Sequence, residues 1–380
     1  MNKMAGSAHG LARRALQAAK RKIIHHLGFV SDQKFYLDSG MVTPRTDVER
    51  IMLYCDAVDI EFILPVDGSK ARNSYRPRFV YGIPDATIDP ISNLIYDSNG
   101  EFIAESSSWL ALRQLYSWPQ PSMRMPSSML TGEFIFLPNN GFYHWLIEDL
   151  PVFLKSSAVA PKARVILPRT AASYVRDVTE LIDNDIVFID SPVRVERLVM
   201  TAKTAGLGSP LAGLTPHPAD VAILRGFFTK YYEPSTGDRK LYLSRVGQKR
   251  SPANELALQL DMEKQGFVTF HGAGMSLLSQ IALFSSATQL VGMHGAALSN
   301  IVWAPEGVDV CEIFSSGYMP SCYSALTAIR RGCYTPLSYT SGPENVIDAK
   351  ALERLAVIAR RVSGTKQTGL SSASKLQWEK

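Results

Sequence analysis

A histidine and two carboxylates near the middle of the chain have the spacing of acid–base machinery. His144 and Glu148 are four residues apart and follow an expected strand at 133–137, so a helix would place both on one face. A carboxylate beside an imidazole orients the ring and raises its basicity, as a general base requires. Glu148 and Asp149 are adjacent like charges, an arrangement that raises the pKa of one of the two carboxyl groups. The alternative is an amphipathic helix with a solvated polar edge.

A glycine-containing turn at 292–300 (GMHGAALSN) has the composition of a phosphate site. It lies between two apolar runs, which predicts strand, turn, short helix and strand. Backbone N–H groups at the helix N-terminus would bind a diphosphate, and His294 adds a donor. Asn300 either fixes the turn or contacts phosphate. The alternative is a tight packing turn, because the dinucleotide glycine fingerprint and the P-loop are both absent.

A polar pair, Ser244 and Arg245, ends the expected strand at 240–244. An arginine at the carboxyl end of a parallel strand points into the crevice where open α/β sheets bind ligands. Its planar guanidinium matches phosphate oxygens. Arg250 follows on the same loop, before a helix expected from Glu255 to about Lys264. The alternative for each arginine is a surface ion pair.

The order of apolar runs predicts the elements that must position these groups. Residues 45–110 are β-rich and interrupted by prolines, whereas strands and helices alternate from residue 132. This alternation predicts parallel sheets with right-handed crossovers. Pro151 is expected to end or kink its helix. The expected strands lie near 133–137, 164–168, 186–189, 194–202, 240–244, 267–270, 289–292, 308–314 and 334–339, and the expected helices near 143–156, 171–182, 217–232 and 346–362.

The two ends of the chain differ in charge and composition. Residues 1–31 carry six basic residues and no acidic one, while the whole chain has a net charge of +5. Within them, an apolar stripe at 12, 16, 19, 23 and 27 predicts a basic amphipathic helix that contacts an anionic membrane surface. The alternatives are a helix docked on the protein and, ranked lower, a mitochondrial presequence. Residues 363–380 are expected to be disordered.

Composition excludes several classes of protein. The 380 residues are 46% hydrophobic, enough for more than one domain, and no apolar run is long enough to span a membrane. Four cysteines without a metal-ligand pattern favour a reducing, cytoplasmic setting. Outside the N-terminal arm there is no basic excess, which argues against nucleic-acid binding. The Asp183-Asn184-Asp185 triplet resembles a metal motif, but it lies in a helix-to-strand turn away from the expected crevice.

Taken together, these segments resemble glycosyltransferase family 61 across about residues 130–315. The resemblance is carried by Phe142-Tyr143-His144-Trp145-Leu146, Glu148, Leu150-Pro151, Tyr242-Leu243-Ser244-Arg245, Arg250, Asn254-Glu255, Gly266-Phe267, Gln280, Gly292, His294-Gly295-Ala296, Leu298, Asn300 and Glu312-Ile313. The residue at 297 departs from the pattern, since alanine stands where glycine is frequent.

The resemblance implies an α/β protein of GT-B-like architecture, with two Rossmann-like domains facing across a cleft. It implies inverting transfer from a nucleotide sugar, commonly a UDP-sugar, without an essential metal or other cofactor. A glycan or lipid-linked acceptor in cell-surface or capsular polysaccharide synthesis would fit, as would a peripheral position on the inner face of the plasma membrane. The expected segments are an arm at 1–31, an acceptor domain at 32–205, a linker at 206–216, a nucleotide-sugar domain at 217–345, a helix at 346–362 and a tail at 363–380.

The expected roles divide between the two domains. His144, supported by Glu148 or Asp149, removes the acceptor proton, with a carboxylate acting directly as the variant. Arg245 and Arg250 neutralise the leaving diphosphate. Glu312 accepts a ribose hydroxyl or serves structure. The expected nucleotide-sugar contacts are Ser244, Arg245, Arg250, Gly292, His294, Gly295, Ala296, Asn300 and Glu312. The alternatives are a non-catalytic nucleotide-sugar or glycan-binding protein and an oxidoreductase, which would need the missing glycine fingerprint.

Overall fold

The computed structural model describes residues 49–55, 58–75, 78–103, 106, 123–201, 203, 216–232, 238–248, 250–315, 319–340 and 345–360. The expected N-terminal arm at 1–31, most of the expected linker (206–215) and the expected tail at 363–380 lie outside these ranges.

The first sheet has a parallel and an antiparallel part. Strands β9, β6, β7 and β8 are parallel neighbours in that order, while β4 runs antiparallel to β9 and also pairs with β1 and β5. The strands expected from residue 132 onward are thus parallel neighbours, as their alternation with helices predicts. The antiparallel pairs all involve β4, which lies in the β-rich segment 45–110 for which no strand direction was predicted, and the short turn that joins β4 to β5 permits only antiparallel pairing. The strands are β1 (Glu49–Cys55), β4 (Arg78–Asp89), β5 (Leu94–Tyr96), β6 (Ser128–Phe136), β7 (Arg164–Pro168), β8 (Ile186–Ile189) and β9 (Val193–Thr201).

The second sheet is parallel throughout, as the alternation predicts. Its order is β11-β10-β12-β13-β14, so the chain moves outward from β10 to β11 and then returns to β12 on the other side of β10. In such a sheet the carboxyl ends of β10 and β12 form the crevice where ligands bind. The strands are β10 (Arg239–Leu243), β11 (Phe267–Phe270), β12 (Ala287–Met293), β13 (Asp309–Ser315) and β14 (Cys333–Tyr339).

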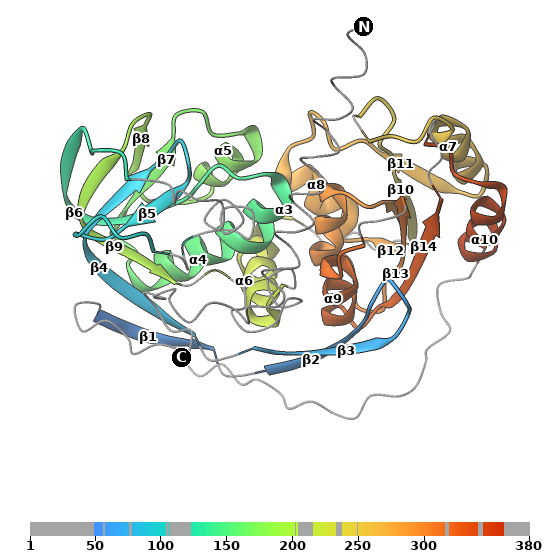
Figure 1. Cartoon of the computed structure of the whole chain (residues 1–380), viewed down its shortest axis with the longest axis horizontal. Coiled ribbons are helices and arrows are strands. Elements are labelled where there is room, and N and C mark those ends of the chain that lie inside the picture. Colours follow the sequence, from blue (N-terminus) through green and yellow to red (C-terminus); the bar gives the residue numbers. More distant parts are fainter. Residues whose placement is uncertain are drawn as a thin grey trace, which may run out of the picture.

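Helices cover both faces of the second sheet (Figure 1). One face packs against α7 and α10, and the other packs against α8, the 3₁₀ helix η5 and α9 toward the first sheet. The helices that follow β10 and β12 thus lie on opposite faces, which opens the crevice between those strands. The helices are α7 (Glu255–Lys264), α8 (Leu277–Phe284), η5 (Ala296–Trp303), α9 (Cys322–Ile329) and α10 (Ala349–Ala359).

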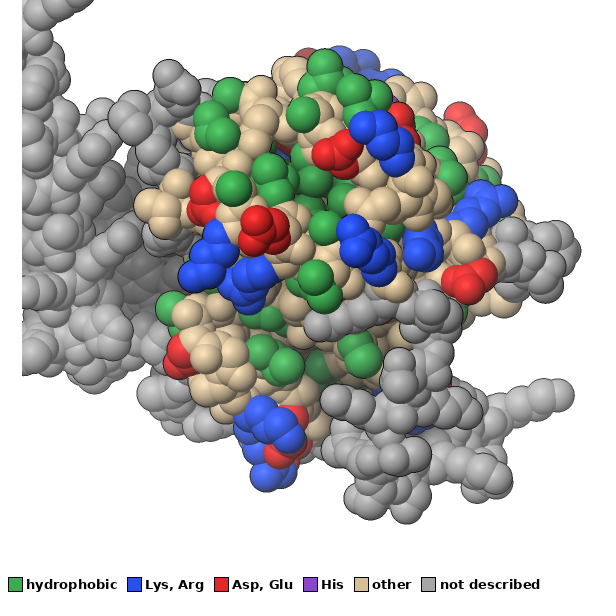
Figure 2. Space-filling view, turned by 90° about the vertical axis from the view of Figure 1, so that its right-hand side faces the viewer, with side chains coloured by type: hydrophobic (Ala, Val, Ile, Leu, Met, Phe, Trp, Pro, Cys, Tyr) green, Lys and Arg blue, Asp and Glu red, His purple; other side chains and the backbone are tan. Residues whose placement is uncertain are grey.

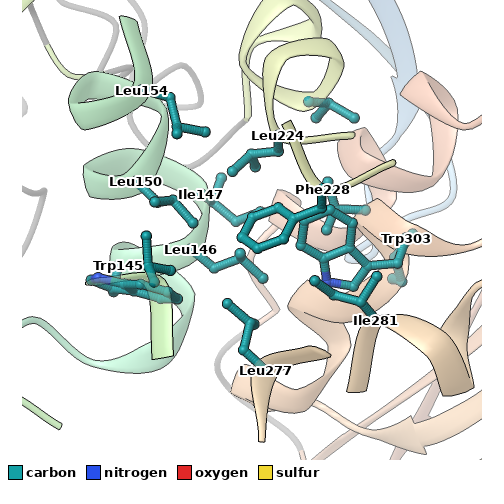
Figure 3. Packing of buried hydrophobic residues seen from close by; sticks show 14 of the residues in the cluster. Trp145, Leu146, Ile147, Leu150, Leu154, Leu224, Phe228, Leu277, Ile281 and Trp303 are labelled. Carbon is teal, nitrogen blue, oxygen red and sulfur yellow. The ribbon is translucent and has the colours of Figure 1, made fainter. Parts of the chain in front are cut away.

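The two sheets share one hydrophobic cluster that crosses between their helices. Figure 3 shows Leu146 and Ile147 from the first half beside Phe228, Trp303 and Leu277. Burial of such side chains stabilises each by about 1.5–3 kcal/mol, so this cluster fixes how the halves face each other. The helices that supply it around the first sheet are α3 (Phe142–His144), the π-helical turn η2 (Trp145–Asp149), α4 (Leu150–Val159), α5 (Ser173–Thr179) and α6 (Pro218–Phe228).

A hairpin from the N-terminal part of the chain packs on the second half. Strands β2 (Val58–Ile63) and β3 (Lys70–Tyr75) run antiparallel beside α9 (Figure 1). The backbone N–H of Ile63 donates to Ser324 Oγ at 3.1 Å, and that hydroxyl donates to Ile63 O at 2.5 Å. A segment that lies within the expected acceptor domain, 32–205, thus contacts the helix between β13 and β14.

Helix boundaries mostly follow the expected ranges. The bounds of α7 agree with the expectation, whereas α10 starts three residues later than the expected 346 because Asp348 caps it by accepting from Ala351 N. Pro151 does not end its helix. It lies in the first turn of α4, directly after the π-helical turn, where Leu150 N donates to Trp145 O. Because proline has no N–H to donate, a first-turn position costs no hydrogen bond.

A buried ion pair holds α4 against α6. Lys155 Nζ donates to Asp220 Oδ1 at 2.7 Å, and both side chains are almost fully buried. Replacing Lys155 with methionine would leave a buried carboxylate without its cation, so we expect a loss of about 3–5 kcal/mol of unfolding free energy. Urea unfolding measures this loss. Lys264→Met removes an exposed pair with Asp261 and should cost under about 1 kcal/mol. Equal losses in the two variants would refute the prediction.

The outer face of the second half carries charges of both signs among scattered apolar side chains (Figure 2). Among the described residues, no helix is long and apolar enough to cross a membrane. Contact of residues 1–31 with a membrane stays a prediction, because these residues lie outside the described ranges.

Candidate functional site

Arg245 and His294 meet at the crevice between β10 and β12. Each lies two residues beyond a paired position on the two neighbouring strands, Leu243 on β10 and Gly292 on β12. Arg245 Nη1 donates to the backbone oxygen of His294 at 2.5 Å. Arg245 Nε is buried without a hydrogen-bond partner among the described residues. An unsatisfied buried guanidinium N–H is costly, so this group is well suited to an anionic ligand.

Close packing explains the glycines of this turn. A Cβ at Gly292 would lie 2.7 Å from the Cβ of Leu243, and one at Gly295 would lie 3.0 Å from Arg245 Nη1. Larger residues would push β12 away from β10 or displace the guanidinium. Ala296 then opens η5, whose N-cap residue is Gly295. The backbone N–H groups of this helix start lie next to Arg245, as an anion site requires.

Glu255 organises the loop that carries the two arginines. This fully buried carboxylate accepts from Arg245 N and from Ser251 Oγ, the latter at 2.6 Å. Ser244 Oγ donates to Gln259 and accepts from Val246 N, so it stabilises the turn itself.

Arg250 lies exposed on the same loop. Burial lowers the pKa of Arg245, and the charge of Arg250 adds to the effect. Two cations therefore stand beside the crevice.

His294 is held by a buried carboxylate. Its Nδ1 lies 2.5 Å from Glu312 Oε1, and Glu312 Oε2 accepts from the Tyr334 hydroxyl at 2.5 Å. Glu312 is fully buried, and both of its oxygens are engaged in these bonds. This geometry favours orientation of the imidazole over contact with a ribose hydroxyl.

Asn300 lies inside the second half rather than at its surface. It is fully buried, and its Nδ2 donates to Gln280 Oε1 at 3.0 Å and to Ala297 O at 3.2 Å. Of the two expected roles, the geometry favours fixing the turn over contacting phosphate.

His144 pairs with Glu148 across one helical turn. His144 Nδ1 lies 3.0 Å from Glu148 Oε2, and the carboxylate is buried. Burial alone would lower the pKa of His144, but the hydrogen bond and charge of Glu148, aided by Asp149, outweigh it and raise the pKa. With Nδ1–H donated to Glu148, Nε2 is the nitrogen that accepts a proton.

Asp149 faces away from His144. It forms an ion pair with Lys203, and its Oδ2 accepts from Asn140 Nδ2 at 2.6 Å. Burial raises the pKa of Asp149, and Lys203 and Asn140 oppose the rise. The charge of Glu148 contributes least to this pKa. The main cause of the raised pKa is therefore burial, and not the neighbouring carboxylate that the sequence had suggested. The geometry therefore favours Glu148, not Asp149, as the support for His144.

Aromatic side chains connect the two histidines. Tyr143 packs edge-on against both His144 and Tyr323, with ring centroids 5.2 and 5.5 Å apart, and Tyr323 lies 5.5 Å from His294. Tyr143 also hydrogen-bonds the buried thiol of Cys322. The start of α9 thus stands between the two His–carboxylate pairs and joins them into one site.

Three residues of the candidate site had no clear signal in the sequence. Lys203 is a lone lysine near the expected linker, and Tyr323 and Tyr334 lie in apolar runs where tyrosine usually serves packing. Within the described residues no group of three or more His, Cys, Asp or Glu side chains is arranged as metal ligands. Asn184, in the Asp183–Asp185 triplet, donates to the carbonyls of Pro161 and Ala163 as a turn residue would.

Residues 142–311 match the family model described as Glycosyltransferase 61. This segment belongs to glycosyltransferase family 61. It begins at the helix that carries His144 and ends within β13, just before Glu312, so it contains both histidines and both arginines. A search of curated protein sequences found no match.

The match assigns residues 142–311 to a family of glycosyltransferases, enzymes that move a sugar from a donor to an acceptor. The resemblance noted in the sequence is thereby confirmed over most of its expected range. The matched segment runs from one half of the fold into the other.

Proposed function

We propose that this chain is an inverting, metal-independent glycosyltransferase of GT-B-like architecture. The donor is a nucleotide sugar, with UDP as the expected nucleotide, and the acceptor is a hydroxyl of a glycan or lipid-linked glycan in cell-surface polysaccharide synthesis. One observation carries the proposal: two His–carboxylate pairs, one on each side of the Tyr143–Tyr323 contact, stand beside a partly unsatisfied arginine at the crevice.

On the donor side, the diphosphate binds at the start of η5. Arg245, whose guanidinium already contacts the His294 carbonyl, neutralises the charge that grows on the leaving phosphate. Arg250 adds positive charge from the loop edge. Electrostatic stabilisation of this kind does the work that a metal ion does in other transferases.

On the acceptor side, His144 is the general base. Its Nε2 takes the hydroxyl proton while the acceptor oxygen attacks the anomeric carbon and the bond to the phosphate oxygen breaks. That bond's electron pair stays on the phosphate, and the configuration at carbon inverts. Glu148 orients the ring and stabilises the imidazolium that forms.

Calorimetric titration with nucleotides and UDP-sugars, with and without a divalent cation, tests the proposal. We expect metal-independent binding of UDP. Binding that requires metal would overturn the metal-independent mechanism. Nucleotide binding without transfer to any acceptor would favour a non-catalytic binding protein, and no binding of any nucleotide would overturn the donor assignment.

The acidic limb of the pH–rate profile should depend on Glu148. Since Glu148 raises the pKa of His144, the base is neutral only above that raised value, and the rate falls as pH drops through it. Glu148→Gln removes the raising charge and leaves burial, so kcat/KM should fall and its acidic limb should move to lower pH. Glu353→Gln, on the exposed face of α10, should change neither. A limb that stays in place in Glu148→Gln would contradict the pairing.

A further inference from the structure

A chain of hydrogen bonds runs behind His294 across three neighbouring strands. The Tyr334 hydroxyl on β14 donates to Glu312 on β13, and the other oxygen of Glu312 binds His294 Nδ1, directly after β12. Both donor–acceptor distances are 2.5 Å. The strands are consecutive in the sheet, so the backbone itself sets the spacing of the three side chains.

Burial makes this chain sensitive to the loss of any member. Glu312 is fully buried, and burial raises its pKa while the hydrogen bonds from His294 and Tyr334 oppose that rise. Without the Tyr334 hydroxyl, one carboxylate oxygen would have no donor among the contacts that the structure shows. An unsatisfied buried charge is expensive, so Tyr334 stabilises the ionised carboxylate that His294 needs as its partner.

The imidazole is also fixed on its faces. It stacks on Phe314 with ring centroids 5.4 Å apart and an interplanar angle of 18°, and the centroid of the Tyr323 ring lies 5.5 Å from that of the imidazole. With Nδ1 bound to Glu312 and the ring held between aromatic side chains, the orientation of the imidazole is set, and Nε2 lies on the edge of the ring away from the carboxylate.

We propose that Tyr334 is a positioning residue for glycosyl transfer: it acts through Glu312 to hold His294 as an imidazolium, which donates its Nδ1–H to Glu312 and its Nε2–H to the leaving phosphate oxygen. This role rests on the proposed function. The electron pair of the broken sugar–phosphate bond remains on that oxygen, and Tyr334 transfers no proton. Its contribution is orientation and charge at His294, so it should affect turnover more than donor binding.

The test compares Tyr334→Phe with Tyr231→Phe. Tyr231 donates its hydroxyl to Leu181 O at 2.7 Å and packs on Phe227 and Phe228, so it is a matched control outside the hydrogen-bond chain. UDP release is measured with UDP-glucose, UDP-galactose, UDP-N-acetylglucosamine and UDP-xylose, using the donor that gives the fastest release. We expect kcat to fall about tenfold in Tyr334→Phe with donor Kd within about twofold, and no change in Tyr231→Phe.

A double-mutant cycle separates positioning from a general loss of structure. If Tyr334 acts only through His294, then Tyr334→Phe should add no loss of kcat to His294→Asn. Additive losses would overturn the proposal. Should Tyr334→Phe fail to fold, Glu312→Gln breaks the same chain at similar volume, and it should also lower kcat; an unchanged kcat there would overturn the proposal.

A proton NMR spectrum gives a readout that does not need activity. The His294 Nδ1–H proton should resonate far downfield, disappear in His294→Asn, shift in Tyr334→Phe and stay in place in Tyr231→Phe. An unshifted signal together with unchanged kcat would overturn the role of Tyr334 while leaving the proposed function intact. A wild-type protein that binds no nucleotide would overturn the proposed function and the leaving-group role with it, even if the signal showed that Tyr334 orients His294.

Discussion

Replacing His144 with alanine is expected to slow sugar transfer by about 10²–10⁴-fold, the range that a general base contributes. The acceptor hydroxyl would then have no group to take its proton, while Arg245 and the turn at the start of η5 would be untouched. Nucleotide affinity should therefore stay within about twofold of the wild type. Initial rates of transfer and calorimetric titration with UDP measure the two quantities separately.

A glutamine at the same position sharpens this test. His144→Gln keeps a side-chain N–H that can donate to Glu148, but it has no basic nitrogen. If basicity is what matters, glutamine should be as inactive as alanine, whereas alanine, which leaves the buried Glu148 carboxylate without this donor, should lower the melting temperature more than glutamine does. Turnover retained by His144→Gln would show that His144 is not the base, and a carboxylate would then be the candidate.

Replacing Arg245 with alanine is expected to weaken nucleotide binding, which the His144 variants should leave unchanged. Its guanidinium is a half-buried cation at the crevice, and its Nε has no hydrogen-bond partner among the described residues. Charge-assisted hydrogen bonds of this kind are worth about 1.5–3 kcal/mol each, so UDP affinity should fall about 10–150-fold. Calorimetric titration with UDP measures it directly.

Two further variants separate charge from geometry at Arg245. Lysine restores the charge but not the planar fork that reaches the His294 carbonyl, so Arg245→Lys should recover only part of the affinity. Arg331→Ala removes an exposed arginine that pairs with Glu306 and should leave UDP binding unchanged. Equal affinities in wild type and Arg245→Ala would disprove the assigned role.

The second half of the fold was predictable because local patterns determine it. Each of its strands is an apolar run followed by a polar or glycine-containing turn, and only a parallel sheet accommodates that alternation. Arg245 and His294 could be placed together for the same reason, since both follow strand ends. The antiparallel part of the first sheet could not be predicted, because strand pairing over long separations, such as β4 with β9, leaves no local signal.

The partners of the candidate residues were the least predictable part. The spacing of His144 and Glu148 within one helix predicted their contact, whereas Glu148 and Asp149 are adjacent and looked equivalent. The structure distinguishes their roles, because Lys203 forms an ion pair with Asp149 while His144 pairs with Glu148. Likewise, the Tyr334–Glu312 bond depends on the register between β13 and β14, which a single sequence does not encode locally.

The hairpin that rests on α9 has a consequence for how the chain is made. Ser324 follows its partner Ile63 by 261 positions, and synthesis of that length takes about 10–50 s at ribosomal rates of about 5–20 residues per second. For that interval the apolar side of β2, including the buried Phe62, has no docking surface. The contact between the hairpin and α9 thus forms late, because it joins an N-terminal segment to a helix near the C-terminal end of the described chain. Dividing the chain within the expected linker, 206–216, would leave the hairpin on one fragment and α9 on the other. The second fragment would then expose the face of α9 that the hairpin covers, and the first turn of α9 holds Tyr323 in the candidate site.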